Sequence, residues 1–169
     1  MKVMFVCMGN ICRSPLAHAV FQDLVDARGL RATILVESSG TDAYHTGEQA
    51  DRRMRETAAR HGTHIDHRAL HLSPRHLAEY DLIVAMDQAN LRGIERLAQG
   101  RSELLAKVHL LREFEPNRAA EAAVEGVPDP YYGGADGFET VYAIVSRCCA
   151  VLLEWVLERI DDGSQPARP

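Results

Sequence analysis

The chain passes from a strand into a helix within the ten residues Val6-Cys7-Met8-Gly9-Asn10-Ile11-Cys12-Arg13-Ser14-Pro15. The apolar run over residues 2–8 is rich in Val and Phe and predicts a buried strand. Serine followed by proline is typical of a helix start, which predicts Ser14 as the N-cap and Pro15 as the first helical residue. A buried strand that leads directly into a helix is the opening unit of an α/β fold.

The rest of the chain repeats this alternation of strands and helices. Apolar residues at helical spacing follow Pro15 until Gly29 supplies a stop. Further strands are predicted at residues 32–37, 81–86 and 107–111, and further helices at residues 49–61, from the third strand to about residue 98, and at 138–160. Residues 112–127 form a long connection of low periodicity. The alternation indicates a mostly parallel sheet with helices on both faces, in one domain over residues 1–162 with a flexible tail at 163–169.

Composition and charge limit the classes of function. The chain has 169 residues, 46% hydrophobic and 25% charged, which is enough for one core without disulfides. A net charge of −5 leaves no excess of cations to neutralise phosphates, so we expect no nucleic-acid partner. The N-terminus lacks signal-peptide features, and charged residues interrupt the apolar stretch 141–160, so we expect no membrane span. Cysteines at positions 7, 12, 148 and 149 suit a reducing, cytoplasmic setting.

The loop after the first strand has the composition of an anion site. Ligands of open α/β sheets bind beyond the carboxyl ends of the strands, where this loop must lie. Gly9 and Asn10 tolerate unusual backbone angles, so successive N–H groups of the loop can point inward. The N-terminus of the following helix adds to the attraction for an anion. The loop therefore predicts a phosphate cradle that needs no P-loop lysine.

Cys7 lies at the base of this cradle and Arg13 at its rim. Inward amides and a helix N-terminus stabilise a thiolate, which can lower a cysteine pKa by several units. The planar fork of arginine matches two phosphoryl oxygens. Ser14 can donate its hydroxyl to the Cys7 sulfur and so ease its later departure. Together these residue types predict phosphoryl transfer to sulfur.

Such a reaction also needs an acid for the leaving oxygen, and Asp129 is the candidate. It lies in Val127-Pro128-Asp129-Pro130-Tyr131-Tyr132, where a proline on either side limits how far the carboxyl group can move. An Asp-Pro turn is common, so this segment alone carries little weight. The interpretation of Asp129 as the acid is strengthened by the cysteine loop, because the reaction predicted there needs one.

The two segments together resemble the low-molecular-weight protein tyrosine phosphatases. Supporting matches are Glu37-Ser38-Ser39-Gly40-Thr41, His61-Gly62, Asp66-His67, Met86-Asp87 with Asn90-Leu91, and Phe138-Glu139-Thr140-Val141-Tyr142. The resemblance covers nearly the whole chain in order. It implies a four-stranded parallel sheet in a flavodoxin-like arrangement.

The resemblance also implies a role for each matching residue. Cys7 is then the nucleophile, Arg13 the phosphate clamp, and Asp129 the group that protonates the leaving phenolate and later deprotonates the water. Met8, Gly9, Asn10, Ile11, Cys12 and Ser14 would form the phosphate-binding loop, with Ser38 and His67 supporting Asn10 in holding its shape. No cofactor and no metal is implied. The implied substrate is a protein phosphorylated on tyrosine, with a tyrosine kinase as one candidate.

Four residues extend the resemblance further. Cys12 corresponds to a second loop cysteine that can trap an oxidised nucleophile as a reversible disulfide, which implies redox sensitivity. Tyr44 and Tyr131 are expected to form two aromatic walls that suit a flat phenyl phosphate. Ile11 stands where the phosphoarginine-directed members of the family carry threonine, which favours phosphotyrosine.

The histidines are expected to have no metal-binding role. His61, His64, His67 and His71 have spacings of three and four, but Gly62 breaks the helix and no thiol completes a site. Solvated histidines, or histidines that support the loop, are the better interpretation. His18 is expected on the polar, solvated side of the first helix.

Two other functions remain open at this stage. A thiol-dependent arsenate reductase would use the same loop, but it needs further cysteines in the middle of the chain, and there are none between Cys12 and Cys148. A non-catalytic phosphate-binding module would need neither a nucleophile nor an acid. A hydrolysis assay separates all three functions.

Overall fold

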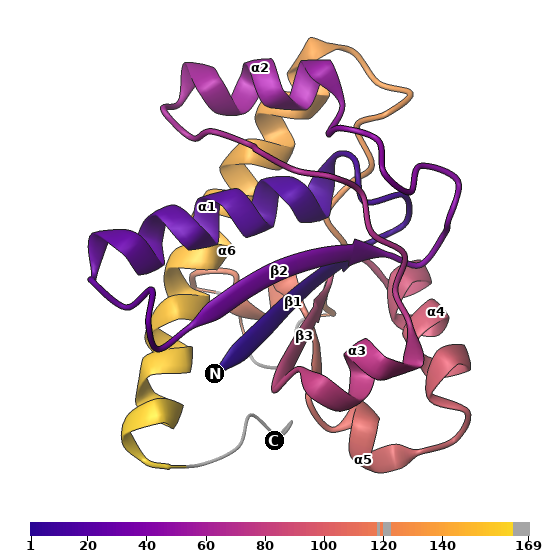
Figure 1. Ribbon diagram of the computed structural model, residues 1–169. Coiled ribbons are helices and arrows are strands. Elements are labelled where there is room, and N and C mark those ends of the chain that lie inside the picture. The colour runs from indigo at the N-terminus through magenta and orange to yellow at the C-terminus, as the bar shows by residue number, and fades with distance from the viewer. Residues whose placement is uncertain (118, 120–122, 164–169) are drawn as a thin grey trace.

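Four parallel strands form the centre of the structure, a computed structural model that describes residues 1–117, 119 and 123–163 (Figure 1). They are β1 (Lys2–Cys7), β2 (Leu35–Gly40), β3 (Leu82–Ala85) and β4 (Val108–Leu110), in the spatial order β2-β1-β3-β4. This is the flavodoxin-like order. The expected α/β fold with a four-stranded parallel sheet is confirmed.

Both faces of the sheet are covered, as expected. On one side lie α1 (Arg13–Ala27) and α6 (Ala135–Asp161), with α2 (Arg52–Arg60) packed against them. On the other lie α3 (Pro74–Glu79), α4 (Gln88–Ala98) and α5 (Ser102–Leu105). A short 3₁₀ helix, η1 (Leu111–Phe114), follows β4 and contacts α6. The short elements α3, α5 and η1 are not predicted, because they span too few residues to show a period.

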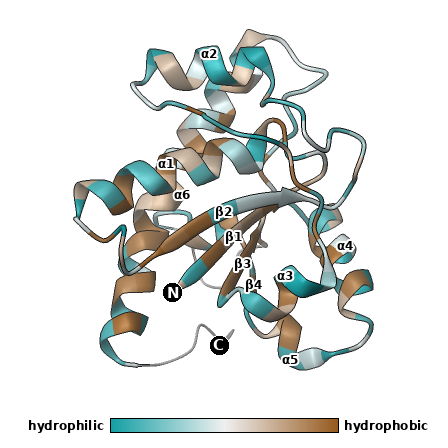
Figure 2. Cartoon of the chain, viewed as in Figure 1, coloured by the Kyte–Doolittle hydropathy of each residue, from teal (hydrophilic) through white to brown (hydrophobic). Residues whose placement is uncertain are grey.

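Alternation along β1 divides the core in two. Val3 and Phe5 face the α1 and α6 side, while Met4 and Val6 face the α3 to α5 side, and all four are fully buried. Successive strand side chains point to opposite faces, so a strand covered by helices on both sides must be apolar throughout. Figure 2 shows this contrast between the apolar strands and the hydrophilic outer turns of the helices.

The start of α1 differs from the expectation. The helix begins at Arg13 with Cys12 in the N-cap position, and the N–H of Leu16 donates to the Cys12 carbonyl at 3.2 Å. Ser14 is therefore already helical and is not the N-cap, because its hydroxyl bonds the Cys7 sulfur instead. Pro15 falls in the first turn, where a missing N–H costs nothing. Gly29 ends the helix as expected, with φ of 70°.

The second strand also differs, since it occupies Leu35–Gly40 rather than residues 32–37. The preceding residues form a turn in which the N–H groups of Thr33 and Ile34 donate to the Leu30 carbonyl. At its other end β2 continues to Gly40, because its polar end pairs in register with β1, opposite Cys7. Periodicity of apolar residues does not reveal that pairing.

The helices α2 and α6 follow their predicted patterns. The predicted inner side of Ala50, Met54 and Ala58 is buried, but α2 begins at Arg52 with Asp51 as its N-cap, so Ala50 precedes the helix rather than belonging to it. Among the described residues, α6 is the helix that is long and apolar enough to cross a membrane. Its apolar side packs against α1, α2 and η1, so these features are those of a core helix. The predicted tail at residues 163–169 lies outside the described residues, apart from Gly163.

The carboxyl ends of β1, β2 and β3 meet at one edge of the sheet. Cys7 pairs with Gly40, and a Cβ on Gly40 would lie 2.6 Å from the Met8 carbonyl oxygen, so the loop after β1 requires glycine there. Just beyond β3, the N–H of Val127 donates to the Met86 carbonyl at 2.7 Å. This bond brings the segment that contains Asp129 to the same edge.

Candidate active site

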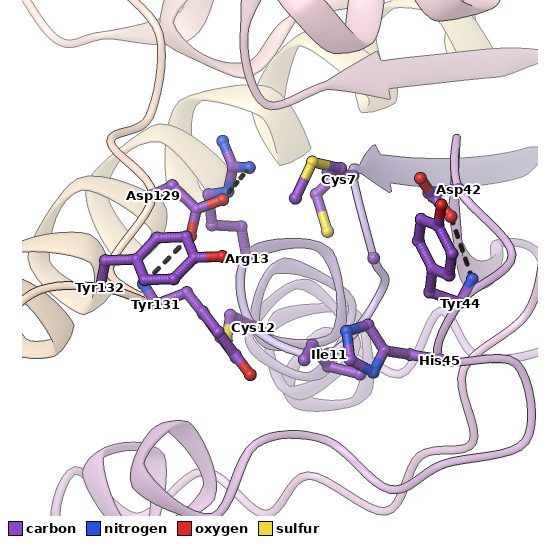
Figure 3. A pocket seen from close by; sticks show the side chains of 12 residues that line it. Cys7, Ile11, Cys12, Arg13, Asp42, Tyr44, His45, Asp129, Tyr131 and Tyr132 are labelled. Atoms are coloured by element: carbon purple, nitrogen blue, oxygen red, sulfur yellow. Dashed lines mark hydrogen bonds and ion pairs between the residues drawn. The ribbon is translucent and has the colours of Figure 1, made fainter.

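A cavity of about 420 Å³ opens at this edge of the sheet (Figure 3). The residues that line it come from the loops after β1 and β2 and from the segment before α6: Cys7, Met8, Gly9, Ile11, Cys12, Arg13, Asp42, Tyr44, His45, Asp129, Tyr131 and Tyr132. A pocket of this size accommodates a small ligand.

Cys7 is the last residue of β1 and lies at the floor of the cavity, where it is 3% exposed. Its sulfur accepts a hydrogen bond from the Ser14 hydroxyl at 3.0 Å and another from the Asn10 N–H at 3.3 Å. Both donors point at the sulfur, which is therefore held in place by the loop and by the first turn of α1.

Asn10 is the frame of the loop that surrounds this sulfur. It is fully buried in the left-handed region at φ of 55°, and its side-chain amide donates to Ser14 Oγ at 2.8 Å and to Ser38 Oγ at 3.0 Å. Its Oδ1 accepts from the N–H of Leu70 at 2.7 Å. These bonds fix the loop in one shape, and asparagine is among the few residues that tolerate this conformation.

His67 supports the same loop from outside. Its Nε2 lies 2.9 Å from the Asn10 carbonyl oxygen, and because a carbonyl only accepts, Nε2 must carry the proton. Burial lowers the pKa of His67, although the bond to Asn10 and the charge of Asp66 oppose that shift. The contact requires a proton on Nε2, and the lowered pKa favours the neutral ring that carries its proton there.

Arg13 lies beneath the rim of the cavity and is 3% exposed. Its Nη1 donates to Asp87 Oδ2 at 2.5 Å and to the Val127 carbonyl at 3.1 Å, and its Nη2 donates to Asp129 Oδ2 at 2.7 Å. Burial opposes the charge, but Cys7 and the two carboxylates outweigh it and raise the pKa of Arg13. The guanidinium is thus a fixed cation beside the sulfur.

Asp129 lies beside Arg13 at the cavity, and the two side chains are joined by a hydrogen bond (Figure 3). Its Oδ1 accepts from the N–H of Tyr131 at 3.1 Å while Oδ2 is bound to Arg13. The carboxylate is 37% exposed, so water reaches it. A carboxyl group that is held by hydrogen bonds and is also accessible to solvent is suited to exchange protons with a bound molecule.

Aromatic rings form two sides of the cavity. Tyr44 and Tyr131 stand at opposite sides in Figure 3, as expected. Tyr132, which was not expected to belong to the site, also lines it and packs edge-on against Tyr131 with ring centroids 5.0 Å apart. Tyr44 and Tyr132 are 87% and 94% exposed, so their rings are available to a ligand.

The candidate residues of the sequence thus fall into two groups. Cys7, Met8, Gly9, Ile11, Cys12, Arg13, Tyr44, Asp129 and Tyr131 line the cavity. Asn10, Ser14, Ser38 and His67 do not line it and lie behind the loop, where they bond to one another or to the sulfur.

Sequence reasoning missed three polar residues of the site: Asp42, His45 and Asp87. Asp87 follows β3 directly and both binds Arg13 and accepts from the N–H of Asn90 as the N-cap of α4. A signal for it was present, because acidic residues at the carboxyl end of a parallel strand reach the ligand edge. His45 lies against Gly9, where an added Cβ would be 2.9 Å from its ring. Nothing in the sequence pattern indicates that contact.

Cys12 is buried in the same loop as Cys7, and neither cysteine is in a disulfide. Burial raises the pKa of the Cys12 thiol well above its ordinary value, and the charges of Asp51 and Cys7 add to that effect. Cys12 is therefore a thiol at neutral pH, and Cys7 is the loop cysteine with hydrogen-bond donors aimed at it.

Among the described residues no group of three or more His, Cys, Asp or Glu side chains is placed to hold a metal ion. The expectation that His18 is solvated is wrong. His18 is partly buried beside His67, and burial together with that neighbour lowers its pKa to about 4. Helical periodicity alone does not show that residues 64–67 lie over this side of α1.

Comparisons with known proteins agree with this geometry. The family described as low molecular weight phosphotyrosine protein phosphatase matches residues 2–162. A low molecular weight protein-tyrosine-phosphatase of Streptomyces coelicolor is 42% identical over 160 residues, which are 95% of this chain and 96% of the relative.

Two solved structures show the same fold. A protein tyrosine phosphatase from Entamoeba histolytica has a TM-score of 0.84 at 33% identity and covers 96% of this chain and 98% of its own. A Drosophila arginine phosphatase has a TM-score of 0.82 at 31% identity, with coverage of 92% and 98%. The resemblance inferred from the sequence is confirmed. This chain belongs to the low molecular weight phosphotyrosine protein phosphatase family.

Proposed function

We propose that this protein hydrolyses phosphotyrosine in proteins, and simple aryl phosphates, through a cysteinyl-phosphate intermediate and without a metal ion. The observation that carries the proposal is the meeting of three groups in one cavity: a hydrogen-bonded sulfur on Cys7, the fixed cation of Arg13 and the restrained carboxyl group of Asp129. A nucleophile, a clamp and an acid are the parts that this reaction needs.

In the first step the Cys7 thiolate attacks phosphorus. The S–P bond forms, the P–O ester bond breaks, and Asp129 gives its proton to the departing phenolate oxygen. Arg13 and the N–H groups of the loop neutralise the charge on the equatorial oxygens. In the second step Asp129 takes a proton from water, the water oxygen bonds to phosphorus, and the S–P bond breaks to release phosphate and the thiolate. The Ser14 hydroxyl stabilises that departing sulfur.

Phosphotyrosine is the proposed substrate because of the walls of the cavity. The rings of Tyr44, Tyr131 and Tyr132 line the same cavity as Cys7, which is buried while Tyr44 and Tyr132 are exposed. The flat phenyl ring of a phosphotyrosine packs well between aromatic rings. The same ring separates the phosphate from the backbone of the substrate protein. Ile11 adds an apolar contact at the loop.

Phosphoarginine is the competing substrate class, since one structural relative is an arginine phosphatase. We favour phosphotyrosine because Ile11 replaces the threonine expected in phosphoarginine-directed members, and an isoleucine side chain offers no hydrogen bond to a guanidinium. The partners proposed are a tyrosine-phosphorylated protein and, as one candidate, a tyrosine kinase. The proposed location is the cytoplasm, where Cys7 stays reduced.

The test is hydrolysis of phenyl phosphate, a phosphotyrosine peptide and a phosphoarginine peptide in the presence of a chelator. We expect wild type to turn over the first two, Cys7→Ser to be inactive, and Asp129→Ala to be slowed by about 10²-fold or more, the usual contribution of a general acid. Turnover of phosphoarginine in preference to phosphotyrosine would reassign the substrate. Phosphate binding without turnover of any substrate would make the protein a binding module.

A further inference from the structure

Arg53 is outside the predicted site. Its contacts connect two segments that line the cavity, the phosphate-binding loop and the segment that precedes α6. It is the second residue of α2, and its Nε and Nη2 donate to the two carboxylate oxygens of Asp51 at 3.1 and 2.8 Å. Asp51 is in turn tied to the phosphate-binding loop, because its N–H donates to the Ile11 carbonyl at 2.7 Å. A planar guanidinium held at two points by a carboxylate has a fixed orientation.

That orientation directs the guanidinium at two aromatic rings. Its central carbon lies 4.7 Å from the centroid of Phe138, a buried residue of α6, and 5.4 Å from the centroid of Tyr131. Both distances are within the range of a cation–π interaction. Arg53 therefore joins the phosphate-binding loop to the segment that precedes α6.

The contact with Tyr131 leads directly to the proposed acid. The N–H of Tyr131 donates to Asp129 Oδ1, so the position of the tyrosine backbone and that of the carboxylate are coupled. The contacts run from Ile11 through Asp51 and Arg53 to Tyr131 and Asp129. Without the arginine, the described contacts still hold Asp129 from the Arg13 side but leave the Tyr131 ring, itself 37% exposed, without its cation.

We propose that Arg53 is a positioning residue that holds the acid loop, residues 129–132, against the phosphate-binding loop through the ring of Tyr131. The inference rests on the proposed function, because it takes Asp129 to be the general acid. Arg53 does not line the cavity, so it acts on the leaving group through Asp129 and has no part in binding the phosphate.

A role in placing the acid has a kinetic signature that a purely structural role lacks. A poor leaving group such as phenolate needs its proton in the transition state, whereas a dinitrophenolate departs without one. Misplacing Asp129 therefore slows phenyl phosphate and spares dinitrophenyl phosphate. A loosened fold, or weaker phosphate binding, slows both substrates alike.

The experiment compares kcat/KM for these two substrates in wild type, Arg53→Met, Arg53→Lys, Arg52→Met and Asp129→Ala. Arg52→Met is the matched control, because Arg52 is the neighbouring arginine, its side chain donates to Glu56, and it is 74% exposed. Arg53→Lys keeps a cation for the rings but loses the planar fork for Asp51. Inhibition by inorganic phosphate and the thermal midpoint are measured for every variant.

We expect Arg53→Met to lower kcat/KM about tenfold on phenyl phosphate and less than twofold on dinitrophenyl phosphate, a part of the full general-acid effect. Arg53→Lys should recover some of the loss, Arg52→Met should match wild type, and the phosphate inhibition constant should stay unchanged. Equal losses on both substrates, no loss on either, or an equal loss in Arg52→Met would overturn the inference. If Asp129→Ala itself shows no leaving-group dependence, the proposed function has failed rather than the role of Arg53.

Discussion

Arg13 and Asp129 are joined by a hydrogen bond of 2.7 Å between Nη2 and Oδ2, so the proposed phosphate clamp also holds the proposed acid. A phosphoryl group that enters the cavity competes with this carboxylate for the guanidinium. The charge that binds the substrate and the charge that positions the acid are therefore shared, and removing either partner must affect the other.

The first prediction follows from this competition. Asp129→Ala should bind inorganic phosphate about fivefold more tightly than wild type, since a partly exposed charge interaction is worth about 1 kcal/mol. Competitive inhibition of aryl phosphate hydrolysis measures this constant. Asp42→Ala is the control, because Asp42 lines the same cavity while its carboxylate accepts from the N–H of Tyr44 instead of Arg13. An equal gain in both variants would show that general repulsion, rather than release of Arg13, is responsible.

Asp87 should have two separable effects, one on catalysis and one on stability. Asp87→Asn keeps an oxygen for the N–H of Asn90 but loses the charge that fixes Arg13, so kcat/KM should fall about tenfold with little change in stability. Asp87→Ala also removes the N-cap of α4, which costs about 1 kcal/mol more. Steady-state kinetics and urea unfolding measure the two effects. Equal stability of the two variants would contradict the capping role.

How far the site could be predicted depends on how local its signals are. Cys7 ends β1 and Arg13 begins α1, so both flank one short loop. Their spacing is weak evidence by itself, and it indicates the chemistry because it falls between a predicted strand and a predicted helix start. Asp129 is far along the chain in an Asp-Pro segment that is weak evidence alone, so its selection depended on the need for an acid beside the cysteine loop and on the family resemblance. The contact of Asp87 with Arg13 depends on β3 lying beside β1, a long-range arrangement that no local pattern of residues encodes.

The errors have the same origin. Ser14 has the propensity of an N-cap, but its hydroxyl bonds the Cys7 sulfur, and this tertiary contact overrides the local preference. The end of β2 is polar and lacks the apolar pattern of a buried strand. It nevertheless pairs in register with the end of β1, beside the site. The fold class was predictable because hydrophobic alternation is distributed over the whole chain.

Asn10 should be the residue of the loop whose loss costs most stability. Asn10→Ala removes the side-chain bonds to Ser14, Ser38 and the N–H of Leu70, which at roughly 1 kcal/mol each amounts to about 3 kcal/mol. Asn10→Gly loses the same bonds, but glycine adopts a φ of 55° without strain, so this variant should be about 1 kcal/mol more stable than the alanine variant. Urea unfolding measures both. If the two variants are equally stable, the backbone at this position is not strained.

Cys12 should protect Cys7 from irreversible oxidation. Peroxide oxidises the Cys7 thiolate to a sulfenic acid, and the Cys12 thiol then condenses with it to form a disulfide and water. Activity of wild type should return after treatment with a dithiol, whereas Cys12→Ser should recover much less. Cys148→Ser is the control, because Cys148 is buried in α6 outside the cavity. Equal recovery of wild type and Cys12→Ser would contradict this role.

The last prediction concerns the loss of stability in acid through His18. Burial, with His67 beside it, lowers the pKa of His18 from 6.5 to about 4, although the charge of Glu37 opposes this. Between these values the unfolded chain holds a proton on His18 and the folded chain does not, so the free energy of unfolding falls as the pH falls. At about 1.4 kcal/mol per pKa unit, the loss between pH 7 and pH 4 reaches about 3 kcal/mol at most.

Urea unfolding of wild type and His18→Gln at pH 7 and pH 5 measures this contribution. The glutamine variant cannot take up the proton, so its stability should fall less between the two pH values. His64→Gln is the control, because His64 borders the same polar pocket but is exposed, and it should follow wild type. If wild type and His18→Gln lose the same stability, His18 is protonated in the folded protein as readily as in the unfolded chain, and the burial beside His67 has no energetic consequence.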